Sequence, residues 1–339
     1  MPSPLLTAVA GFPRVRDQYD FVVAGGGHAG LQAALKAGLL HHSALLLDKG
    51  PKYSRSYYAP KMDNIPGFPE GVSGHKLLDA QIAALRPQAD RVTYVTPALV
   101  TAARRSAEGF EVDYEWLRQK RTVRARALVL ALGVVDRMPA IDGKIDDVFP
   151  WANLAIVDFC LFCDGHDMAG RSIAVLGHDA YTARLALDLV HFEPSSLEIL
   201  TNGEPFLAAS PPEERRSLEE QLRGQRIGWF DARIAGYDGI RDRQFHVRFA
   251  DGSVRKYDRG FSGLGWWDMN SAIPRSLGCA FDPEGYVRVD DDCRALAEAG
   301  GEPIPGLYVV GDLKTGWNQI PEAWASAERA VIHAYGYYL

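Results

Sequence analysis

A glycine-rich turn near the start of the chain limits its possible folds more than any other feature. Residues 19–24 are mostly apolar, which is typical of a buried strand. The turn that follows consists of Gly25, Gly26, Gly27, His28, Ala29 and Gly30. A helical pattern over 31–40 comes next, and a second apolar strand over 44–47 ends at Asp48. This order predicts a dinucleotide-binding βαβ unit.

The residue types in this unit have physical reasons. Gly25 permits the tight turn, Gly27 lets a pyrophosphate approach the backbone, and Gly30 permits close packing of the helix. Asp48 can accept a hydrogen bond from a ribose hydroxyl. We predict that the turn binds a nucleotide cofactor together with Asp48 and the adjacent Lys49.

A C-x-x-C pair lies near the middle of the chain, with Cys160 and Cys163 followed directly by Asp164. Two thiols at this spacing can close a small disulfide ring, and Asp164 could transfer the proton that dithiol chemistry needs. If Cys163 opens a helix, the positive end of that helix would lower the thiol pKa. The pattern favours a reversible redox site.

Two other interpretations of the pair stay open. Zinc normally needs a second cysteine pair or two histidines, whereas Cys279 and Cys293 stand apart and His166 is a single candidate. The third interpretation is a pair of buried, inert cysteines. We predict no metal site.

Composition excludes several classes of protein. With 47% apolar and 24% charged residues, neither disorder nor a fibrous fold is indicated, and the net charge of -6 argues against a general nucleic-acid binder. Basic residues concentrate in 118–126 and 241–259, mostly as solvated strand faces, although such a run could dock an acidic partner. Few cysteines, no secretory signal and no membrane-length apolar stretch predict a cytoplasmic protein away from membranes.

The opening unit is repeated later in the chain. An apolar strand over 127–132 ends at Gly133, and a further strand over 171–176 runs into a turn of Gly177, His178, Asp179 and Ala180 and a helix through residue 189. We predict an α/β fold with two Rossmann-like, three-layer ββα dinucleotide-binding domains, the second inserted in the first. The predicted bounds are 1–18 for a leader, 19–135 with 264–339 for the first domain, and 136–263 for the second.

Together these motifs resemble the low-molecular-weight thioredoxin reductase family of flavin-dependent disulfide oxidoreductases. Their order is the specific part, and the resemblance covers nearly the whole chain after residue 18. The order is the glycine turn, Asn64-x-Pro66-Gly67, the strand ending in Gly133, C-x-x-C-Asp-Gly, a second glycine turn, Gly311-Asp312 and Gln319.

The resemblance implies a role for each motif. The first domain would hold FAD, with residues 25–30 and Asp48 at its adenosine diphosphate half, Asp312 at its ribityl chain, and Gly133 and Gly311 in the same site. Asn64, Gln319 and the Ile320 amide would lie near the isoalloxazine ring. Cys163 would face the flavin, Cys160 would exchange with a substrate disulfide, and Asp164 would act as acid and base. The resemblance also implies a homodimer and a thioredoxin-like partner or a small disulfide substrate.

The second glycine turn departs from the family pattern. The family carries several glycines where this chain has His178, Asp179 and Ala180, and its basic cluster for the 2′-phosphate of NADPH is replaced by residues 200–203. The Asp179 carboxylate would repel a pyrophosphate by about 1 kcal/mol. Trp267 could instead stack a flat ring near this turn.

These departures predict an electron donor other than NADPH. A second FAD at residues 177–180, or a ferredoxin, is the favoured expectation. The alternatives are a conventional NADPH-dependent thioredoxin reductase, a dithiol oxidase that uses oxygen, and a flavin-binding redox sensor without turnover.

Overall fold

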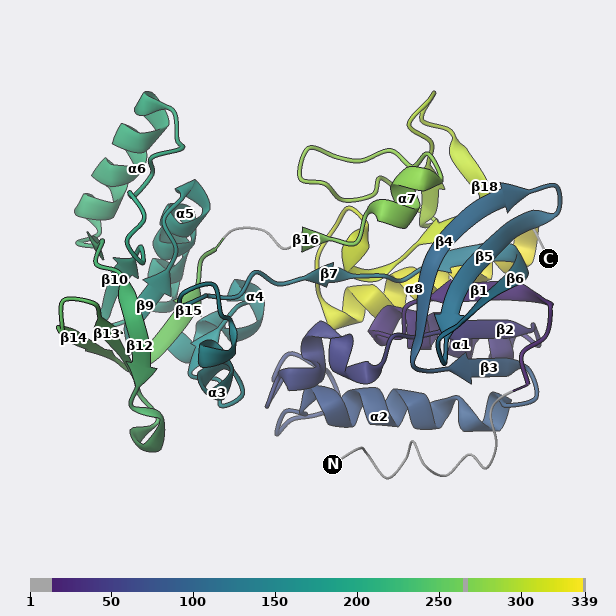
Figure 1. Cartoon of the computed structure of the whole chain (residues 1–339), viewed down its shortest axis with the longest axis horizontal. Helices are drawn as coiled ribbons and strands as arrows, with labels where there is room; N and C mark the ends of the chain where they lie inside the picture. Colours follow the sequence, from purple (N-terminus) through teal and green to yellow (C-terminus); the bar gives the residue numbers. More distant parts are fainter. Residues whose placement is uncertain (1–13, 265–267, 338–339) are drawn as a thin grey trace. The chain divides into compact units, whose positions relative to one another are not determined.

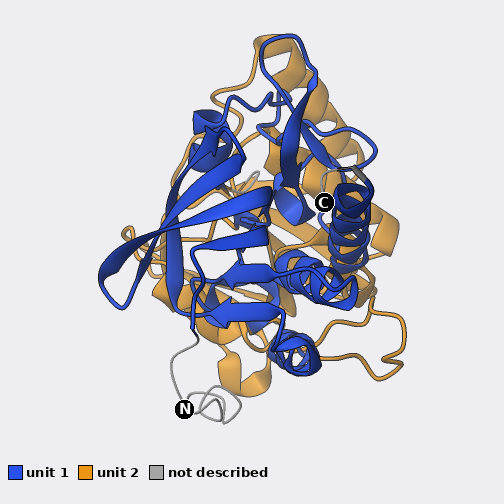
Figure 2. Cartoon of the chain, turned by 90° about the vertical axis from the view of Figure 1, so that its right-hand side faces the viewer, with its two compact units in different colours: residues 1–57, 73–135, 269–339 blue, residues 58–72, 136–268 orange. Residues whose placement is uncertain are grey.

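The computed structural model describes residues 14–264 and 268–337, which form two compact units (Figure 1). The first unit comprises Met1–Tyr57, Ser73–Val135 and Met269–Leu339, and the second comprises Tyr58–Val72 and Asp136–Asp268 (Figure 2). The sequence analysis put 58–72 in the first domain. The contacts group it with the second unit because the Tyr58 ring packs on Phe149 and Asp63 faces His166.

The first unit is built on a sheet in the order β17-β18-β6-β1-β2-β3. The strands of this path are β17 (Arg294–Leu296), β18 (Pro303–Val309), β6 (Gln119–Leu130), β1 (Gln18–Ala24), β2 (Ala44–Leu47) and β3 (Val92–Val95). All neighbours pair in parallel except β17 with β18. The carboxyl ends of β1 and β2 therefore lie at one edge of the sheet, where open α/β sheets bind ligands.

The strand β6 connects an antiparallel branch to this sheet. Its first half pairs antiparallel with β5 (Gly109–Trp116), which pairs with β4 (Ala98–Ser106), and its second half pairs with β1. The sequence analysis expected a strand over 127–132. The strand begins earlier, at Gln119, because the polar-apolar alternation of its first half passes directly into the fully buried run Ala127–Leu130.

The first sheet is the middle one of three layers. Successive residues of β1 point to opposite faces. Val22 and Ala24 belong to a core with β4, β5 and α7 (Ala272–Ser276), whereas Phe21 and Val23 belong to a core with the helices α1 (His28–Leu39), α2 (Gly74–Ala84) and α8 (Ile320–Tyr337). The predicted three-layer ββα architecture is confirmed for this unit.

The second unit repeats the arrangement with a five-stranded parallel sheet in the order β11-β10-β9-β15-β8. Its strands are β11 (Gly228–Phe230), β10 (Ser196–Leu200), β9 (Ser172–Leu176), β15 (Arg259–Ser262) and β8 (Val157–Asp158). The helices α5 (Ala180–Leu189) and α6 (Pro212–Gly224) share a core with one face. The antiparallel strands β12 (Ile234–Asp238), β13 (Phe245–Phe249) and β14 (Val254–Tyr257) share a core with the other face.

The links between the units are short. They contain β7 (Val134–Val135) and β16 (Asp268–Met269), which pair as a two-stranded sheet. The return link begins after β15, because Phe261 still pairs within the second sheet. Two short helices, α3 (Phe149–Ala152) and α4 (Leu161–Asp164), complete the second unit. In the part of the chain that the structure describes, no helix is long and apolar enough to span a membrane.

Candidate redox and cofactor sites

The glycine turn after β1 has positions that only glycine fits. Gly25 has φ +104°, and a Cβ on it would lie 2.2 Å from the Ala131 carbonyl oxygen. A Cβ on Gly30 would lie 1.8 Å from the Gly25 carbonyl oxygen. Any side chain at either position would clash with backbone, so the turn and the start of α1 are held against the sheet by the absence of side chains.

The N-terminus of α1 is open. Gly27 is its N-cap residue and makes no side-chain cap hydrogen bond, and the atom nearest to a Cβ built there is Ser54 Oγ at 3.8 Å. The first N–H groups of a helix need partners from outside the helix, and the helix dipole favours an anion there. The geometry of α1 fits a pyrophosphate.

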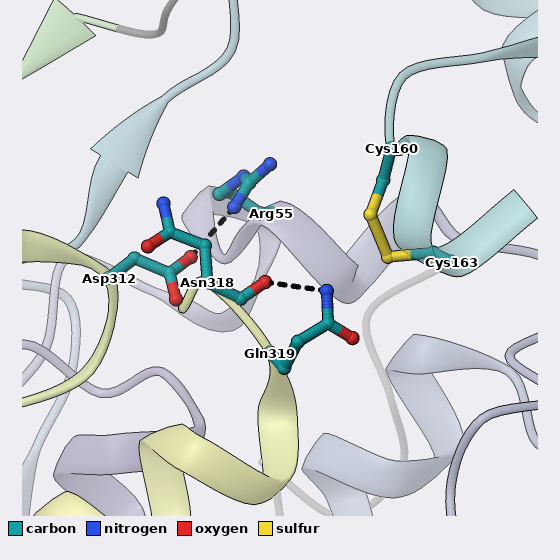
Figure 3. The surroundings of a disulfide bond; sticks show 6 residues. All are labelled: Arg55, Cys160, Cys163, Asp312, Asn318 and Gln319. Carbon is teal, nitrogen blue, oxygen red and sulfur yellow. Dashed lines mark hydrogen bonds and ion pairs between the residues drawn. A yellow bond between two sulfur atoms is a disulfide. The ribbon is translucent and has the colours of Figure 1, made fainter. Parts of the chain in front are cut away.

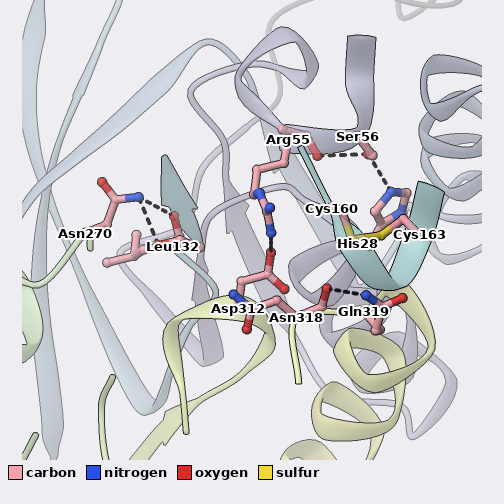
Figure 4. Close-up of polar contacts among 12 residues, drawn as sticks. His28, Arg55, Ser56, Leu132, Cys160, Cys163, Asn270, Asp312, Asn318 and Gln319 are labelled. Carbon is pink, nitrogen blue, oxygen red and sulfur yellow. Dashed lines mark hydrogen bonds and ion pairs between the residues drawn. A yellow bond between two sulfur atoms is a disulfide. The ribbon is translucent and has the colours of Figure 1, made fainter. Parts of the chain in front are cut away.

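His28 lies in this turn but is held by the protein. Its Nδ1 lies 2.5 Å from Gln81 Oε1 and its Nε2 lies 2.7 Å from Ser56 Oγ, as Figure 4 shows for Ser56. Burial lowers the His28 pKa below its ordinary value, so the ring is neutral at pH 7. The adjacent Ala29 is buried. His28 therefore fixes the segment around Ser56 and supplies no positive charge for a phosphate.

Asp48 ends β2 as predicted, and 5% of it is exposed. The Tyr94 hydroxyl on β3 donates to Asp48 Oδ2 at 2.7 Å, and the backbone N–H groups of Gly26 and Gly50 also donate to this carboxylate. Burial raises the Asp48 pKa despite these donors. An ionised carboxylate accepts about four hydrogen bonds, which leaves room for a ribose hydroxyl.

The sequence analysis and the structure differ in how they present two residues of this region, Tyr94 and Lys49. The sequence analysis missed Tyr94, because its contact with Asp48 depends on the parallel pairing of β2 with β3. Lys49, which it included, is exposed, and its ammonium lies 4.1 Å from the centre of the Tyr53 ring.

Asp312 lies after β18 in a short helix over Gly311–Leu313. The Gly311 N–H donates to Ser326 Oγ of α8 at 3.1 Å, and Arg55 Nη1 donates to Asp312 Oδ2 at 2.8 Å (Figures 3 and 4). Arg55 was missed by the sequence analysis, since nothing near it in the sequence marks it. The ion pair joins two segments that are 257 residues apart and fixes the Asp312 carboxylate.

The helix α8 begins at Ile320. The Gln319 carbonyl oxygen accepts from the Ala323 N–H at 2.9 Å, and Gln319 Nε2 donates to the Asn318 carbonyl oxygen at 3.0 Å (Figure 3). Among the described residues, Asn318 Oδ1 is buried without a hydrogen-bond partner. A bound cofactor with an N–H or O–H group would satisfy it.

The remaining predicted cofactor residues divide between the units. The Gly133 carbonyl oxygen accepts from Asn270 Nδ2 at 3.0 Å, within the first unit. Asn270 Nδ2 also donates to the Leu132 carbonyl oxygen at 2.8 Å (Figure 4). Asn64 belongs to the segment Tyr58–Val72, which groups with the second unit, whereas Asp312, Gln319 and Ile320 belong to the first. In the first unit the open α1 terminus, the buried Asp48 and the unpartnered Asn318 amide oxygen fit the two ends of an FAD molecule.

Cys160 and Cys163 form a disulfide with an S–S distance of 2.03 Å (Figure 3). The helix α4 begins at Leu161, so Cys160 is the N-cap residue and Cys163 lies inside the single turn rather than opening it. The Cys160 carbonyl oxygen accepts from the N–H groups of Cys163 and Asp164. The turn therefore holds the two sulfurs and the following carboxylate in one rigid loop.

The carboxylate behind the disulfide is in an environment that favours its protonated form. Burial raises the Asp164 pKa to about 7, and the negative charges of Asp158 and Asp167 add to the shift. Arg259 acts in the opposite direction. Asp164 therefore titrates near neutral pH, where an acid-base group is most effective. The sequence analysis missed Asp158 and Arg259.

The other two cysteines have no place in this chemistry. Cys279 and Cys293 are free and buried, and burial raises their pKa values to about 12 and about 11. They are inert thiols at neutral pH. Within residues 14–264 and 268–337, no group of three or more His, Cys, Asp or Glu side chains could hold a metal ion.

The second glycine turn differs from the first at the helix it precedes. Asp179 is the N-cap residue of α5, and its Oδ1 accepts from the Thr182 N–H at 2.9 Å and from Thr182 Oγ1 at 3.0 Å. The Thr182 side chain in turn accepts from the Asp179 N–H, which completes a capping box. A carboxylate of the protein occupies the position where an anion would bind the helix.

The rest of this turn is also engaged. A Cβ on Gly177 would lie 2.3 Å from Thr182 Oγ1, and the His178 carbonyl oxygen accepts from the Leu207 N–H at 2.7 Å. Leu207 is fully buried, so the segment after β10 packs onto the turn. Ala180 is the first residue of α5. Trp267, the other predicted residue of this site, lies outside the described residues.

Known proteins share both the sequence pattern and the fold. The chain matches the pyridine nucleotide-disulphide oxidoreductase family over residues 19–328. Thioredoxin reductase tcpT of Claviceps purpurea is 28% identical over 312 residues, which cover 90% of this chain and 89% of that protein. The bifunctional thioredoxin reductase/thioredoxin of Mycobacterium leprae is 29% identical over 298 residues, covering 87% of this chain and 60% of that protein.

The solved structures agree on the fold. The crystal structure of thioredoxin reductase from Streptococcus pyogenes has a TM-score of 0.76 at 18% sequence identity, covering 95% of this chain and 99% of that one. The predicted α/β fold with two Rossmann-like domains is confirmed. The family match spans most of the chain and includes the Cys160–Cys163 disulfide. The chain belongs to the pyridine nucleotide-disulphide oxidoreductase family, as a thioredoxin reductase-like, FAD-dependent disulfide oxidoreductase.

Proposed function

We propose that the protein passes two electrons between FAD, the Cys160–Cys163 pair and an external thiol or disulfide, without using NADPH. The observation that carries this proposal is the capped N-terminus of α5. Asp179 fills the anion position with its own carboxylate, whereas the equivalent N-cap of α1 is Gly27, which makes no side-chain cap hydrogen bond. A pyrophosphate at α5 would have to displace this carboxylate and the Leu207 backbone contact.

The end of β10 supports the same proposal. The family's basic cluster for a 2′-phosphate would follow this strand, where the chain has Thr201, Asn202 and Glu204. Asn202 Oδ1 accepts from the Ile234 N–H at 2.8 Å and its Nδ2 donates to the Ala140 carbonyl oxygen at 3.2 Å. Both polar atoms of the Asn202 side chain are therefore used in bonds within the protein. The Glu204 carboxylate would repel a phosphate.

Cys160, Cys163 and Asp164 have separate roles in this proposal. FAD, when bound, supplies or accepts the electron pair. Reduction of the disulfide breaks the S–S bond and places two electrons on the cysteine sulfurs, which then need protons. We assign the exchange with the external partner to Cys160, the flavin side to Cys163, and the proton transfer to Asp164, whose pKa near neutrality lets it give and regain a proton.

In the first unit we assign the FAD contacts to the chain's own donors and acceptors. The N–H groups at the start of α1 would bind the pyrophosphate, and Asp48 would accept from a ribose hydroxyl. Asp312, fixed by Arg55, would contact the ribityl chain. The start of α8 at Ile320 would place its positive dipole toward the ring, where reduction builds negative charge.

The electron route at the flavin end has three forms under this proposal. A ferredoxin-like protein could donate electrons, oxygen could accept them from reduced flavin, or a second FAD could take part. The capped α5 disfavours a second FAD for the same reason as NADPH, because both carry a pyrophosphate. The ferredoxin and oxygen routes need no nucleotide in the second unit.

The names of the relatives favour a second candidate, a conventional NADPH-dependent thioredoxin reductase. The Mycobacterium leprae relative is printed as a thioredoxin reductase joined to a thioredoxin, which supports a thioredoxin-like partner for this chain. A cytoplasmic homodimer belongs to the proposal as well, and cell fractionation with light scattering of the purified protein tests it.

Flavin quantification and dithiol turnover test the proposal. We expect one FAD per chain and steady oxidation or reduction of a thioredoxin-like or small dithiol substrate, lost in both Cys160→Ser and Cys163→Ser. Cys279→Ser is the matched control, since that thiol is buried and distant in sequence from the pair. Two FAD per chain would support the diflavin route, and bound flavin without any turnover would favour a redox sensor over an enzyme.

A further inference from the structure

Asp158 is a buried carboxylate beside the redox loop that the proposed reaction does not yet use. It ends β8, two residues before Cys160, and 6% of it is exposed. Among the described residues no hydrogen-bond donor reaches its Oδ2 atom. A buried carboxylate oxygen without a donor destabilises the folded state. A group kept at that cost next to a disulfide points to a chemical role.

A second unpartnered group faces it from the neighbouring strand. β15 pairs in parallel with β8, with Phe261 opposite Asp158, and Arg259 lies on the same strand. Arg259 Nη1 is also buried without a hydrogen-bond partner among the described residues. The two groups attract each other by charge without a direct hydrogen bond that would fix the carboxylate in its ionised form.

The charged and titratable groups around Asp158 come from three places. Asp164 and Asp167 follow the disulfide and repel it, Arg259 of β15 attracts it, and so do Arg171 and His166. His166 also faces Asp63 at 3.9 Å and Asp167 at 3.8 Å. Asp158 is the buried carboxylate of this set, Asp164 is partly buried, and Asp167 has 43% of its side chain exposed.

We propose that Asp158 is a positioning residue for thiol–disulfide exchange, which shares one proton with Asp164 so that Asp164 holds that proton at neutral pH and can give it to a cysteine thiolate. The inference rests on the proposed roles of Cys160, Cys163 and Asp164. The charge of Asp158 raises the pKa of Asp164, so the two carboxylates resist ionising together near neutral pH, and the Arg259 charge opposes the single negative charge that stays.

The proton balance of the exchange follows. A partner dithiol loses one proton to solvent, and its thiolate attacks Cys160 Sγ. The S–S bond breaks, its electron pair moves to Cys163 Sγ, and the Asp164 proton converts that thiolate to a thiol. The second partner thiol then gives its proton to the Asp164 carboxylate and displaces Cys160, which leaves with the electron pair of the mixed disulfide and takes that proton. The proton that the first partner thiol released to solvent restores protonated Asp164. The partner is oxidised to a disulfide and the cysteines are reduced to two thiols.

The electrostatics agree with the geometry. Burial raises the Asp158 pKa to about 6, and the charge of Asp167 adds to the shift while Arg259 opposes it. For Asp164, burial and then the charge of Asp158 raise the pKa to about 7. Removing the Asp158 charge would leave Arg259 uncompensated, and both changes would lower the Asp164 pKa.

Dithiothreitol reduction of the oxidised holoenzyme tests the inference. The reaction is stopped at intervals with an alkylating agent, and the rate is divided by the fraction of dithiothreitol thiolate over about pH 5 to 9. In the wild type this corrected rate falls as Asp164 ionises. We expect Asp158→Asn to lower the midpoint pH of this decrease by about one unit. The corrected rate at pH 7 is then several-fold lower than in the wild type. Asp158→Glu keeps the wild-type profile.

Two further variants make the test independent of folding defects. Arg259→Gln removes the positive charge that lowers the Asp164 pKa, so it should move the decrease in corrected rate to higher pH. Asp167→Asn removes an exposed charge of the same sign as Asp158 and should move it much less than Asp158→Asn, because solvent screens it. Flavin content and circular dichroism check that each variant is folded, and if Asp158→Asn is not, the upward shift in Arg259→Gln decides.

The outcomes separate this inference from the proposed function. An unchanged midpoint in Asp158→Asn, or a shift no larger than that of Asp167→Asn, would overturn the shared proton while Asp164→Asn still abolishes the fall. A wild-type profile in Asp164→Asn would instead remove Asp164 from its proposed role as the acid. The probe reacts with the disulfide directly, so neither result depends on the identity of the electron donor.

Discussion

The Asp179 carboxylate accepts a hydrogen bond from the Thr182 N–H at 2.9 Å and so caps the helix α5. The first unit has a glycine at the corresponding place before α1. The two βαβ units thus differ at the N-cap residue of the helix, next to the N–H groups that would bind an anion. In the first the helix is open to a ligand, and in the second the protein supplies the anion itself.

Removal of this cap should cost stability. Asp179→Ala loses both arms of the capping box, and we expect the free energy of unfolding to fall by about 1 kcal/mol. Urea denaturation followed by circular dichroism measures it. Asp188→Ala is the control, because Asp188 is an exposed carboxylate of the same helix and should change stability little. Equal losses in both variants would contradict the capping role.

A side chain at Gly25 should abolish cofactor binding. Gly25→Ala places a Cβ 2.2 Å from the Ala131 carbonyl oxygen in a backbone of φ +104°, so the turn must move. We expect a purified protein with little bound FAD, measured as flavin absorbance per chain. Gly224→Ala is the matched control, since no atom lies within 4 Å of a Cβ built there. Full flavin content in Gly25→Ala would refute the assignment of this turn.

The Tyr94 hydroxyl should support FAD affinity through Asp48. Tyr94→Phe removes a donor to a buried carboxylate at 2.7 Å, and we expect a loss of about 1–3 kcal/mol in stability together with weaker FAD binding. Equilibrium dialysis of FAD and thermal unfolding measure the two effects. Tyr19→Phe, which removes a hydroxyl bonded to Thr93 Oγ1 at 3.1 Å, should leave FAD binding unchanged. The same FAD affinity in both variants would exclude Tyr94 from the site.

Stability should fall as pH rises through the range in which Asp158 and Asp164 titrate. Their folded pKa values of about 6 for Asp158 and about 7 for Asp164 lie above the ordinary value of 3.8, so the folded state holds protons that the unfolded state releases. Between about pH 4 and 7 the free energy of unfolding should therefore decrease with pH, by up to about 1.4 kcal/mol per unit for each proton.

Urea denaturation of the oxidised protein at several pH values measures this slope. Asp164→Asn removes one of the two titrating groups, so its slope should be shallower than that of the wild type. Asp251→Asn serves as the control, because the folded pKa of that exposed carboxylate is lowered and its effect is confined to more acidic pH. A wild-type slope in Asp164→Asn would show that Asp164 is ionised in the folded state.

Local patterns were sufficient to predict much of the fold. The strands predicted over 19–24, 44–47 and 171–176 end at the predicted residues. In each case the apolar run or alternation ends where the strand ends, so the pattern and the backbone carry the same information. The disulfide of Cys160 with Cys163 was predicted for the same reason, since its partners are three residues apart.

The misses all depend on contacts between distant segments. Arg55 meets Asp312 across 257 residues, and Arg259 reaches Asp158 only because β15 pairs with β8. The segment Tyr58–Val72 groups with the second unit through contacts to residues about ninety further along the chain. Sequence alone does not place such partners, because no local periodicity connects them.

Anaerobic stopped-flow mixing of the FAD-loaded enzyme with NADPH or with dithiothreitol, followed by the visible absorbance of the flavin, tests the central claim most directly. The account predicts that the dithiol bleaches the flavin in the wild type but not in Cys163→Ser, and that NADPH leaves it oxidised on the timescale of turnover. Fast bleaching by NADPH with a saturating concentration dependence, or dithiol bleaching that survives in Cys163→Ser, would contradict it.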